Sequence, residues 1–321
     1  MGKTTAPVAV LRIRDVFLPC PDFPLPDRPI TPVLSSTTPI KIIECPRDAM
    51  QGIRQFIPTA EKIAYQQKLL ACGFDTLDFG SFVSPKAIPQ MRDTAALLAG
   101  LDLSATRTKL LAIVANRRGA TDALSHPEID YLGYPFSVSE TFQLRNTNAT
   151  LAESLDRVKE IQSMTLAAGK EMVLYLSMGF GNPYGDPWNV EVVEEWVSRL
   201  AELDIRIFQL SDTIGVSNPA SITYLFKNLI PRYPDLEIGA HLHTTPDTWE
   251  EKVAAAANAG CVRFDGALRG YGGCPMAKDD LTGNMPTERL FEHFGFARTG
   301  VDEAAYAVAY RASGEVFLHV P

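Results

Sequence analysis

The chain has 321 residues, of which 46% are apolar, and it carries a formal net charge of -8 with a pI near 5.2. This apolar content excludes disorder as the overall state and allows a large buried core, in either two ordinary domains or one large α/β barrel. The acidic balance leaves no broad basic face for a phosphate backbone, so nucleic acid is not an expected partner.

The first 39 residues differ from the rest because they are crowded with proline. Proline removes a backbone donor and disfavours both helices and strand ladders, so residues 1–39 are expected to form an extended, potentially disordered arm. Five cysteines at irregular spacings, without a CxxC pair, indicate a reducing compartment rather than a disulfide framework or a structural zinc site. The apolar run LLAIVA at 110–115 is too short to cross a bilayer, and we expect a cytoplasmic protein without a membrane partner.

From residue 40 onward, short runs rich in Ile, Val, Leu and Phe alternate with longer segments of helical period. The expected strands are 40–45, 76–81, 109–115, 131–137, 172–177, 205–211, 237–243 and 262–267. The expected helices lie near 59–72, 89–99, 118–125, 151–168, 189–203, 219–231 and 247–259.

Repeated strand–helix units are typical of a parallel sheet, and eight of them in about 250 residues match the size of a (β/α)8 TIM barrel. We therefore predict one barrel domain over residues 40–296, followed by a C-terminal extension over 297–321. A doubly wound open sheet is the weaker alternative, because no GxGxxG follows the first strand.

In such a barrel the active site lies where the strands end, and polar residues gather at those positions. They are Arg47 and Asp48 after the first strand, Asp78 on the second, Asn116 after the third, Ser139 and Glu140 after the fourth, Ser177 on the fifth, Asp212 and Thr213 after the sixth, His241 and His243 on the seventh, and Cys274 after the eighth. Residues far apart in the sequence are thus expected to share one rim. The candidates for binding substrate are Arg47, Asn116, Ser139 and Thr213.

The segment GAHLHTT places His241 and His243 two residues apart. Side chains at i and i+2 of a strand point to the same face, so both imidazoles converge only if this stretch is a strand. With the carboxylate of Asp48 and the amide oxygen of Asn284 they make a mixed nitrogen and oxygen set, which suits Mg²⁺ or Mn²⁺ with open water positions. The alternative is that both histidines are hydrogen-bonded core residues.

Arg47 and Cys274 also have two interpretations each. Arg47 beside Asp48 would suit an exposed turn with a salt bridge, but Pro46 ends the strand and can turn both side chains toward the barrel mouth. Cys274 would suit a buried small hydrophobic residue. Because glycines and a proline flank it in RGYGGCP, it is instead expected on a mobile loop, where a thiol with a pKa of about 8.5 can return a proton to a carbanion.

Seven segments carry a resemblance to a known family. They are ECPRDAMQ (44–51), DFGSFVSPKAIPQM (78–91), SETFQLRNTN (139–148), LSDTIGVSNP (210–219), HLH (241–243), GYGGCP (270–275) and TGN (282–284). In this order they resemble 3-hydroxy-3-methylglutaryl-CoA lyases, metal-dependent (β/α)8 barrel enzymes related to isopropylmalate synthase, from about Ile40 to Gly295.

The resemblance implies roles for individual residues. It assigns the metal ligands to Asp48, His241, His243 and Asn284, the catalytic arginine to Arg47, the loop cysteine to Cys274, the strand 6 carboxylate to Asp212, and to Asp78 a position where the family has glutamate. Departures from the family pattern are Ala49, Met50, Met178, Thr244 and one additional residue between Cys274 and Asn284. These departures leave the metal site intact but bear on which acyl group is bound.

The implied reaction is retro-aldol cleavage of 3-hydroxy-3-methylglutaryl-CoA to acetyl-CoA and acetoacetate, the chemistry of leucine degradation and ketone-body formation. Asp48 or His241 would take the C3 hydroxyl proton, Arg47 would face the thioester oxygen, and Cys274 would protonate the departing carbon. The alternatives are a related 3-hydroxyacyl-CoA aldolase or a Claisen-type synthase on the same barrel, and a barrel that only binds a ligand. The expected partners are an acyl-CoA thioester and, as an open option, a second copy in a homodimer.

Overall fold

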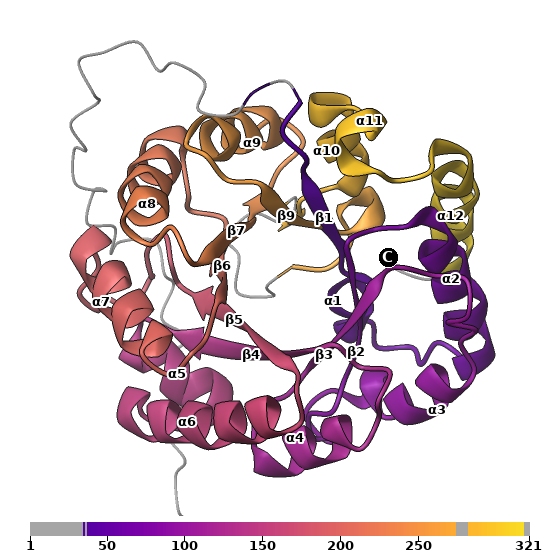
Figure 1. Ribbon diagram of the computed structural model, residues 1–321, viewed down its shortest axis with the longest axis horizontal. Helices are drawn as coiled ribbons and strands as arrows, with labels where there is room; N and C mark the ends of the chain where they lie inside the picture. Colours follow the sequence, from indigo (N-terminus) through magenta and orange to yellow (C-terminus); the bar gives the residue numbers. More distant parts are fainter. Residues whose placement is uncertain (1–34, 36, 274–281, 318–321) are drawn as a thin grey trace, which may run out of the picture.

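The computed structural model, which describes residues 35, 37–273 and 282–317, contains a closed barrel of eight parallel strands surrounded by helices (Figure 1). In spatial order the strands are β1 (Lys41–Glu44), β2 (Thr76–Ser81), β3 (Lys109–Ile113), β4 (Tyr131–Ser137), β5 (Glu171–Ser177), β6 (Ile207–Ser211), β7 (Glu237–His241) and β9 (Arg263–Gly266). Pairing of β1 with β9, from Lys41 opposite Arg263 to Glu44 opposite Gly266, closes the barrel. The predicted (β/α)8 fold is confirmed and the open sheet is wrong.

The helices that connect consecutive strands form the outer layer (Figure 1). They are α2 (Thr59–Cys72), α3 (Thr94–Ala99), α4 (Arg117–Leu124), α6 (Leu151–Ala167), α7 (Val190–Ala201), α8 (Pro219–Arg232) and α9 (Trp249–Asn258). The helix predicted over 89–99 is divided into the 3-10 turn η1 (Pro89–Met91) and α3. Between them, Asp93 has a non-helical backbone, and its side chain accepts from Thr59 and Lys62 of α2.

The ends of these helices follow local sequence signals. Asn116, Asn189 and Asn218 each accept a hydrogen bond from the backbone three residues on, which satisfies one of the free donors at a helix start. Thr150 and Glu153 form a reciprocal capping box at the start of α6. Gly73 ends α2 with a φ of 75°, a conformation that residues with a Cβ rarely adopt.

Five helices and two short strands were not expected from the sequence. The helices are α1 (Pro46–Gln51), α5 (Glu140–Thr147), α10 (Thr287–Phe294), α11 (Phe296–Thr299) and α12 (Glu303–Val316), and η2 (Leu268–Gly270) is a further 3-10 turn. In α1, Pro46 takes the first helical position, where its missing N–H costs no hydrogen bond. This turn buries Arg47 and Asp48, so the exposed-turn interpretation of this pair is wrong.

The stretch 237–243 was expected to be one strand, and this expectation is wrong. Strand β7 ends at His241, and His243 begins β8 (His243–Thr244), which pairs antiparallel with β10 (Gly283–Asn284). The chain leaves the barrel after His241 because Leu242 and His243 find partners in the segment around Asn284, including a 3.1 Å bond from Met285 N to Leu242 O. The two imidazole rings still lie close together, with centroids 5.3 Å apart.

The C-terminal helix α12 packs along α2 on the outside of the barrel (Figure 1). The ring of Phe317 meets Tyr65 of α2 edge-on at 5.9 Å. Within the described residues, no helix is both long and apolar enough to cross a membrane. The division into an arm, a barrel domain and an extension stays a prediction, and residues 1–34 and 36 of the arm lie outside the described residues.

Candidate active site

A cavity of about 690 Å³ opens where the barrel strands end. Seven of the residues predicted at the rim line it: Arg47, Asp48, Asn116, Ser177, Thr213, His241 and His243. A larger hollow of about 850 Å³, near Cys72 and Arg107, includes none of the predicted residues. We therefore place the candidate active site in the smaller cavity, in agreement with the rule that barrel chemistry occurs at the C-terminal ends of strands.

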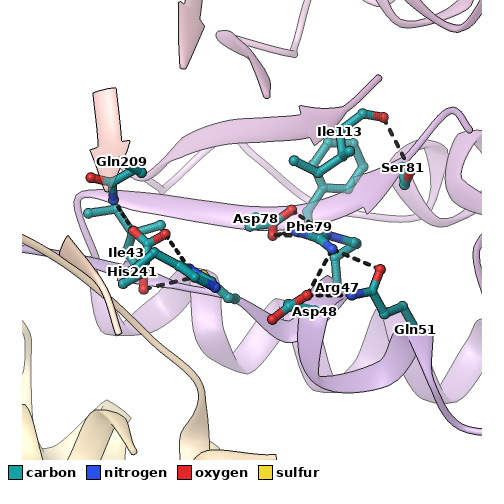
Figure 2. A network of polar contacts seen from close by, with 12 residues as sticks. Ile43, Arg47, Asp48, Gln51, Asp78, Phe79, Ser81, Ile113, Gln209 and His241 are labelled. Atoms are coloured by element: carbon teal, nitrogen blue, oxygen red, sulfur yellow. Dashed lines mark hydrogen bonds and ion pairs between the residues drawn. The ribbon is translucent and has the colours of Figure 1, made fainter. Parts of the chain in front are cut away.

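Arg47 is at the centre of a buried polar network (Figure 2). Its Nε donates to both carboxylate oxygens of Asp78 at 3.0 and 3.1 Å, and Nη2 donates to Asp78 Oδ2 at 2.6 Å. On the other side, Nη1 donates to Asp48 Oδ1 at 3.0 Å and to Gln51 Oε1 at 2.9 Å. Only 7% of Arg47 is exposed, so these bonds fix the guanidinium at the cavity wall.

The two carboxylates beside Arg47 differ in their electrostatics. Burial would raise the pKa of Asp48, but the positive charge of Arg47, the neighbouring histidines and a hydrogen bond from Asn284 lower it. Burial raises the pKa of Asp78 to about 6 despite its contact with Arg47, and the neighbouring Asp48 and Asp265 add to the rise. Arg47 thus lies between two carboxylates, of which Asp48 lines the cavity and Asp78 is buried behind it.

Asp48, His241 and His243 form a group that could hold a metal ion, with one potential ligand atom from each residue lying within 4.8 Å of the others. Both ring nitrogens of His243 and Oδ1 of Asn284 are buried without a hydrogen-bond partner among the described residues. Unpaired buried acceptors are costly, and a divalent ion would satisfy one ring nitrogen of His243 together with Oδ1 of Asn284. The residues present therefore fit a metal ion.

Asn284 is brought to this group by pairing between β8 and β10, which sets it directly opposite His243. Its Nδ2 donates to Asp48 Oδ2 at 2.8 Å and to the carbonyl of Tyr271 at 2.9 Å, which leaves Oδ1 free. The chain passes close by at Gly272, which has a φ of 86° and where a Cβ would lie 2.7 Å from the carbonyl oxygen of Asp48. A residue larger than glycine would push this segment away from the group.

Asp265 on β9 orients the first histidine. Its Oδ2 lies 2.9 Å from His241 Nδ1, and its Oδ1 accepts a hydrogen bond from Gln209 of β6. A carboxylate at Nδ1 selects the tautomer in which Nε2 carries the lone pair, as is common for metal-binding histidines. Burial would lower the pKa of His241, but the hydrogen bond and charge of Asp265 outweigh burial and raise it.

Lys252 of α9 supports the second histidine. Its ammonium, in a residue only 3% exposed, donates to the carbonyl of His243 at 2.8 Å and to Asp212 Oδ2 at 2.9 Å. Asp212 also accepts from the hydroxyl of Ser217. Burial and the charge of His241 lower the pKa of His243 to about 4, so its imidazole is neutral and has a free lone pair at pH 7.

The other predicted residues are distributed as follows. Asn116 and Thr213 line the cavity, and each also bonds to a backbone N–H, of Gly119 and Met178 respectively. Ser139 caps α5 and binds Asp186, away from the cavity lining, and Asp212 also lies outside it. Cys274 falls outside the described residues. The predicted roles of these residues stay predictions.

Sequence reasoning missed Asp265, Lys252 and Tyr175. Tyr175 on β5 lines the cavity and packs edge-on against His241, with ring centroids 5.7 Å apart. Asp265 and Tyr175 did carry a signal, because both stand inside predicted strands at positions that face the barrel interior. Lys252 carried none, because a lysine on a helix normally lies in solvent.

Comparison with known proteins identifies the family that this chain resembles in sequence. A family model described as HMGL-like matches residues 40–304. The hydroxymethylglutaryl-CoA lyase of Bacillus subtilis is 35% identical over 76% of this chain and 81% of its own length. The 3-hydroxy-3-isohexenylglutaryl-CoA/hydroxymethylglutaryl-CoA lyase of Pseudomonas aeruginosa is 32% identical over 78% of this chain and 82% of its own length.

Solved structures agree with these sequence matches. The crystal structure of the Bacillus subtilis HMG-CoA lyase superposes with a TM-score of 0.81 at 32% identity, covering 87% of this chain and 93% of the other. An Acinetobacter baumannii HMG-CoA lyase in complex with coenzyme A and 3-methylmalate gives a TM-score of 0.79 at 29% identity, covering 88% of this chain and 92% of the other. By fold, by sequence and by the extent of the match, this chain belongs to the HMGL-like family.

Proposed function

We propose that this chain is a divalent-metal-dependent carbon–carbon lyase that cleaves 3-hydroxy-3-methylglutaryl-CoA to acetyl-CoA and acetoacetate. The observation that carries the proposal is the group of Asp48, His241 and His243 beside the fixed guanidinium of Arg47 in one cavity. Relatives that match most of the chain are lyases of this kind. They favour cleavage over the Claisen-type synthase, and the clustered site disfavours a barrel that only binds a ligand.

The residues that would hold the ion are Asp48, His241, His243 and Asn284, and Mg²⁺ and Mn²⁺ suit this nitrogen and oxygen set. When bound, the ion would supply Lewis-acid polarisation of the substrate oxygens. Asp265 and Lys252 keep the two imidazoles in place through bonds to the ring of His241 and to the backbone of His243.

The chain's own residues provide the remaining chemistry. Arg47, clamped by Asp78 and Asp48, presents its charge toward a thioester oxygen that becomes negative as the bond breaks. The proposed acceptor of the C3 hydroxyl proton is Asp48 or His241. Asp48 is the weaker base of the two because its pKa is lowered, whereas the pKa of His241 is raised. We propose Cys274 as the acid that protonates the departing carbon, and Asn116 and Thr213 as substrate contacts from the cavity lining.

The proposed partner is an acyl-CoA thioester. The Acinetobacter baumannii relative binds coenzyme A, and the Pseudomonas aeruginosa relative acts on a thioester with a longer C3 branch as well as on the methyl compound. We therefore expect thioester binding here, with the preferred C3 branch set by apolar lining residues such as Val83 and Ile113. Cytoplasmic location and assembly as a homodimer stay predictions.

The test is a panel of 3-hydroxyacyl-CoA thioesters that differ in the C3 branch, incubated with the protein and Mg²⁺ or Mn²⁺, with products identified by mass. Wild-type protein should release acetyl-CoA and a keto acid, and His243→Ala should lose both metal stoichiometry and turnover. His293→Ala, on the exposed face of α10, is the matched control and should keep both. If His241→Ala and His243→Ala both kept full metal content and activity, the metal site would have to lie elsewhere in the protein.

A further inference from the structure

The loop between β5 and α7 contacts helix α5 at both ends. Asp186 binds the start of α5: Oδ2 accepts from the hydroxyl of Ser139 and from Thr141 N at 2.9 Å, and Oδ1 accepts from Thr141 Oγ1 at 2.8 Å. Near the other end, the guanidinium of Arg145 lies over the ring of Tyr184 at 4.6 Å. This one loop, residues 178–189, thus contacts α5 near both of its ends.

The loop is itself held in one shape. Asn182 Oδ1 accepts from the backbone N of Tyr184 at 3.0 Å and of Asp186 at 3.1 Å, and Asn182 Nδ2 donates to the carbonyl of Asp186 at 2.9 Å. Burial would raise the pKa of Asp186, but the hydrogen bonds from Ser139 and Thr141 outweigh it and lower the pKa. Asp186 is therefore an ionised acceptor held both by its own loop and by the start of α5.

Helix α5 forms one wall of the candidate active site. Its C-terminal residues Arg145, Asn146 and Thr147, with Asn148 next to them, line the same cavity as Arg47 and the histidines. A second anchor is Gln143, only 1% exposed, which accepts from Ser137 N at 2.8 Å and donates to Ser154 Oγ at 2.9 Å. Because Gln143 ties the inner side of α5 to the barrel, loss of Asp186 should shift the helix rather than unfold it.

We propose that Asp186 is a positioning residue that sets the affinity for the CoA thioester by holding α5, and with it one cavity wall, in place. This inference rests on the proposed function and deepens it. Asp186 does not line the cavity, so it acts on the substrate only through the helix. The wall it controls presents one cation and several amide or hydroxyl groups, which suits an anionic, hydrogen-bonding ligand such as coenzyme A.

The decisive variant is Asp186→Asn, compared with Asp235→Asn in the exposed turn before β7. Both remove one negative charge, which by itself would slightly favour an anionic thioester. Asp186→Asn should instead weaken thioester binding and raise KM roughly 5- to 30-fold, the size of effect expected when hydrogen bonds to a charged acceptor are weakened. Its kcat should stay within about twofold of wild type, because uniform binding is lost without loss of transition-state contacts. Asp235→Asn should leave both constants unchanged.

A second measurement separates this inference from the proposed activity. The Kd of free coenzyme A, measured by calorimetry with Mn²⁺ present, should rise in Asp186→Asn by a factor similar to that in KM, whether or not any thioester is cleaved. If wild-type protein binds coenzyme A but cleaves nothing in the panel, the proposed function fails and the inference is still decided by this Kd. A wild-type protein that does not bind coenzyme A would overturn the inference.

Three further results would overturn the role of Asp186: an unchanged KM and Kd, a fall in kcat at constant KM, or a loss of Mn²⁺ affinity. If Asp186→Asn lowers Tm by more than about 5 °C, Thr141→Val becomes the deciding variant. It removes one hydroxyl bond to Asp186 and keeps the backbone bond, so it should raise KM in the same direction by a smaller factor. A KM equal to that of wild type would reject the proposal.

Discussion

Glu44 at the end of β1 is fully buried and should make the stability of this protein depend on pH. Its Oε1 accepts from Leu268 N at 2.9 Å, and its Oε2 accepts from the hydroxyl of Thr287, so it joins β1 to the segments that follow β9. Burial raises its pKa from 4.5 to about 8, against the lowering effect of these two hydrogen bonds. The folded protein therefore holds a proton at pH 7 that the unfolded chain has released.

The difference in the pKa of Glu44 between the folded and unfolded states sets how the free energy of unfolding changes with pH. A raised pKa contributes stability that is fully present below about pH 4.5 and is lost as the pH rises through about 8. Between pH 6 and pH 8 the free energy of unfolding should fall by about 2 kcal/mol, because only the folded state still binds the proton of Glu44 in this range. Glu44→Gln keeps the shape and the oxygen that accepts from Leu268 N, and it places a donating amide NH2 beside the hydroxyl of Thr287, which can accept. Because this amide cannot titrate, the variant should lose this part of the pH dependence.

The assay is urea unfolding of wild type and Glu44→Gln at pH 6, 7 and 8 in metal-free buffer, which excludes any contribution from metal binding. The free energy of unfolding of wild type should fall relative to that of the variant as the pH rises. Glu61→Gln, an exposed carboxylate on α2, serves as the control and should run parallel to wild type. Parallel curves for wild type and Glu44→Gln would refute the reasoning.

Two other predictions concern the candidate active site. Cys274→Ala should bind metal normally but lose about 10²- to 10⁴-fold in turnover, and Cys274→Ser should be nearly as slow. If Cys274→Ala turned over at a near-normal rate, this thiol would have no part in the mechanism. Lys252→Met should cost about 3 to 5 kcal/mol of stability, because Asp212 would be left buried without its cation, and should also weaken Mn²⁺ binding by releasing the backbone of His243. A variant as stable as wild type in urea unfolding would contradict the second prediction.

The barrel could be predicted because its signals are local. Alternating apolar strands and capped helices appear in order along the chain, and the strand limits differ from the expected ones by no more than two residues. Helix α12 was also detectable, since Asp302 caps the alanine-rich stretch Glu303–Val316. Helix α5 was harder to detect because its eight residues include Thr, Asn and Arg without a clear apolar period.

The arrangement of the candidate site was only partly accessible from the sequence. The pattern HLH indicated two converging histidines, but the pairing of His243 with Asn284 joins two-residue strands that carry no periodicity. Asp265 and Lys252 could not be ranked because the sequence does not reveal which charged residues become buried together. Such contacts depend on the three-dimensional approach of segments far apart in the chain, and no local propensity encodes them.

The hydrogen bond from Asn284 to Asp48 spans 236 residues of sequence and connects the first strand–helix unit to the segment after the last one. Strands β1 and β9 also pair there and close the barrel. We call this junction between the first and last strands the seam, and the candidate site lies on it. A ligand held jointly by Asp48 and Asn284 can bind only after this seam has formed. Its binding free energy would add to the stability of the closed ring and not to that of a partly folded half-barrel, so occupancy of the site would report on complete folding.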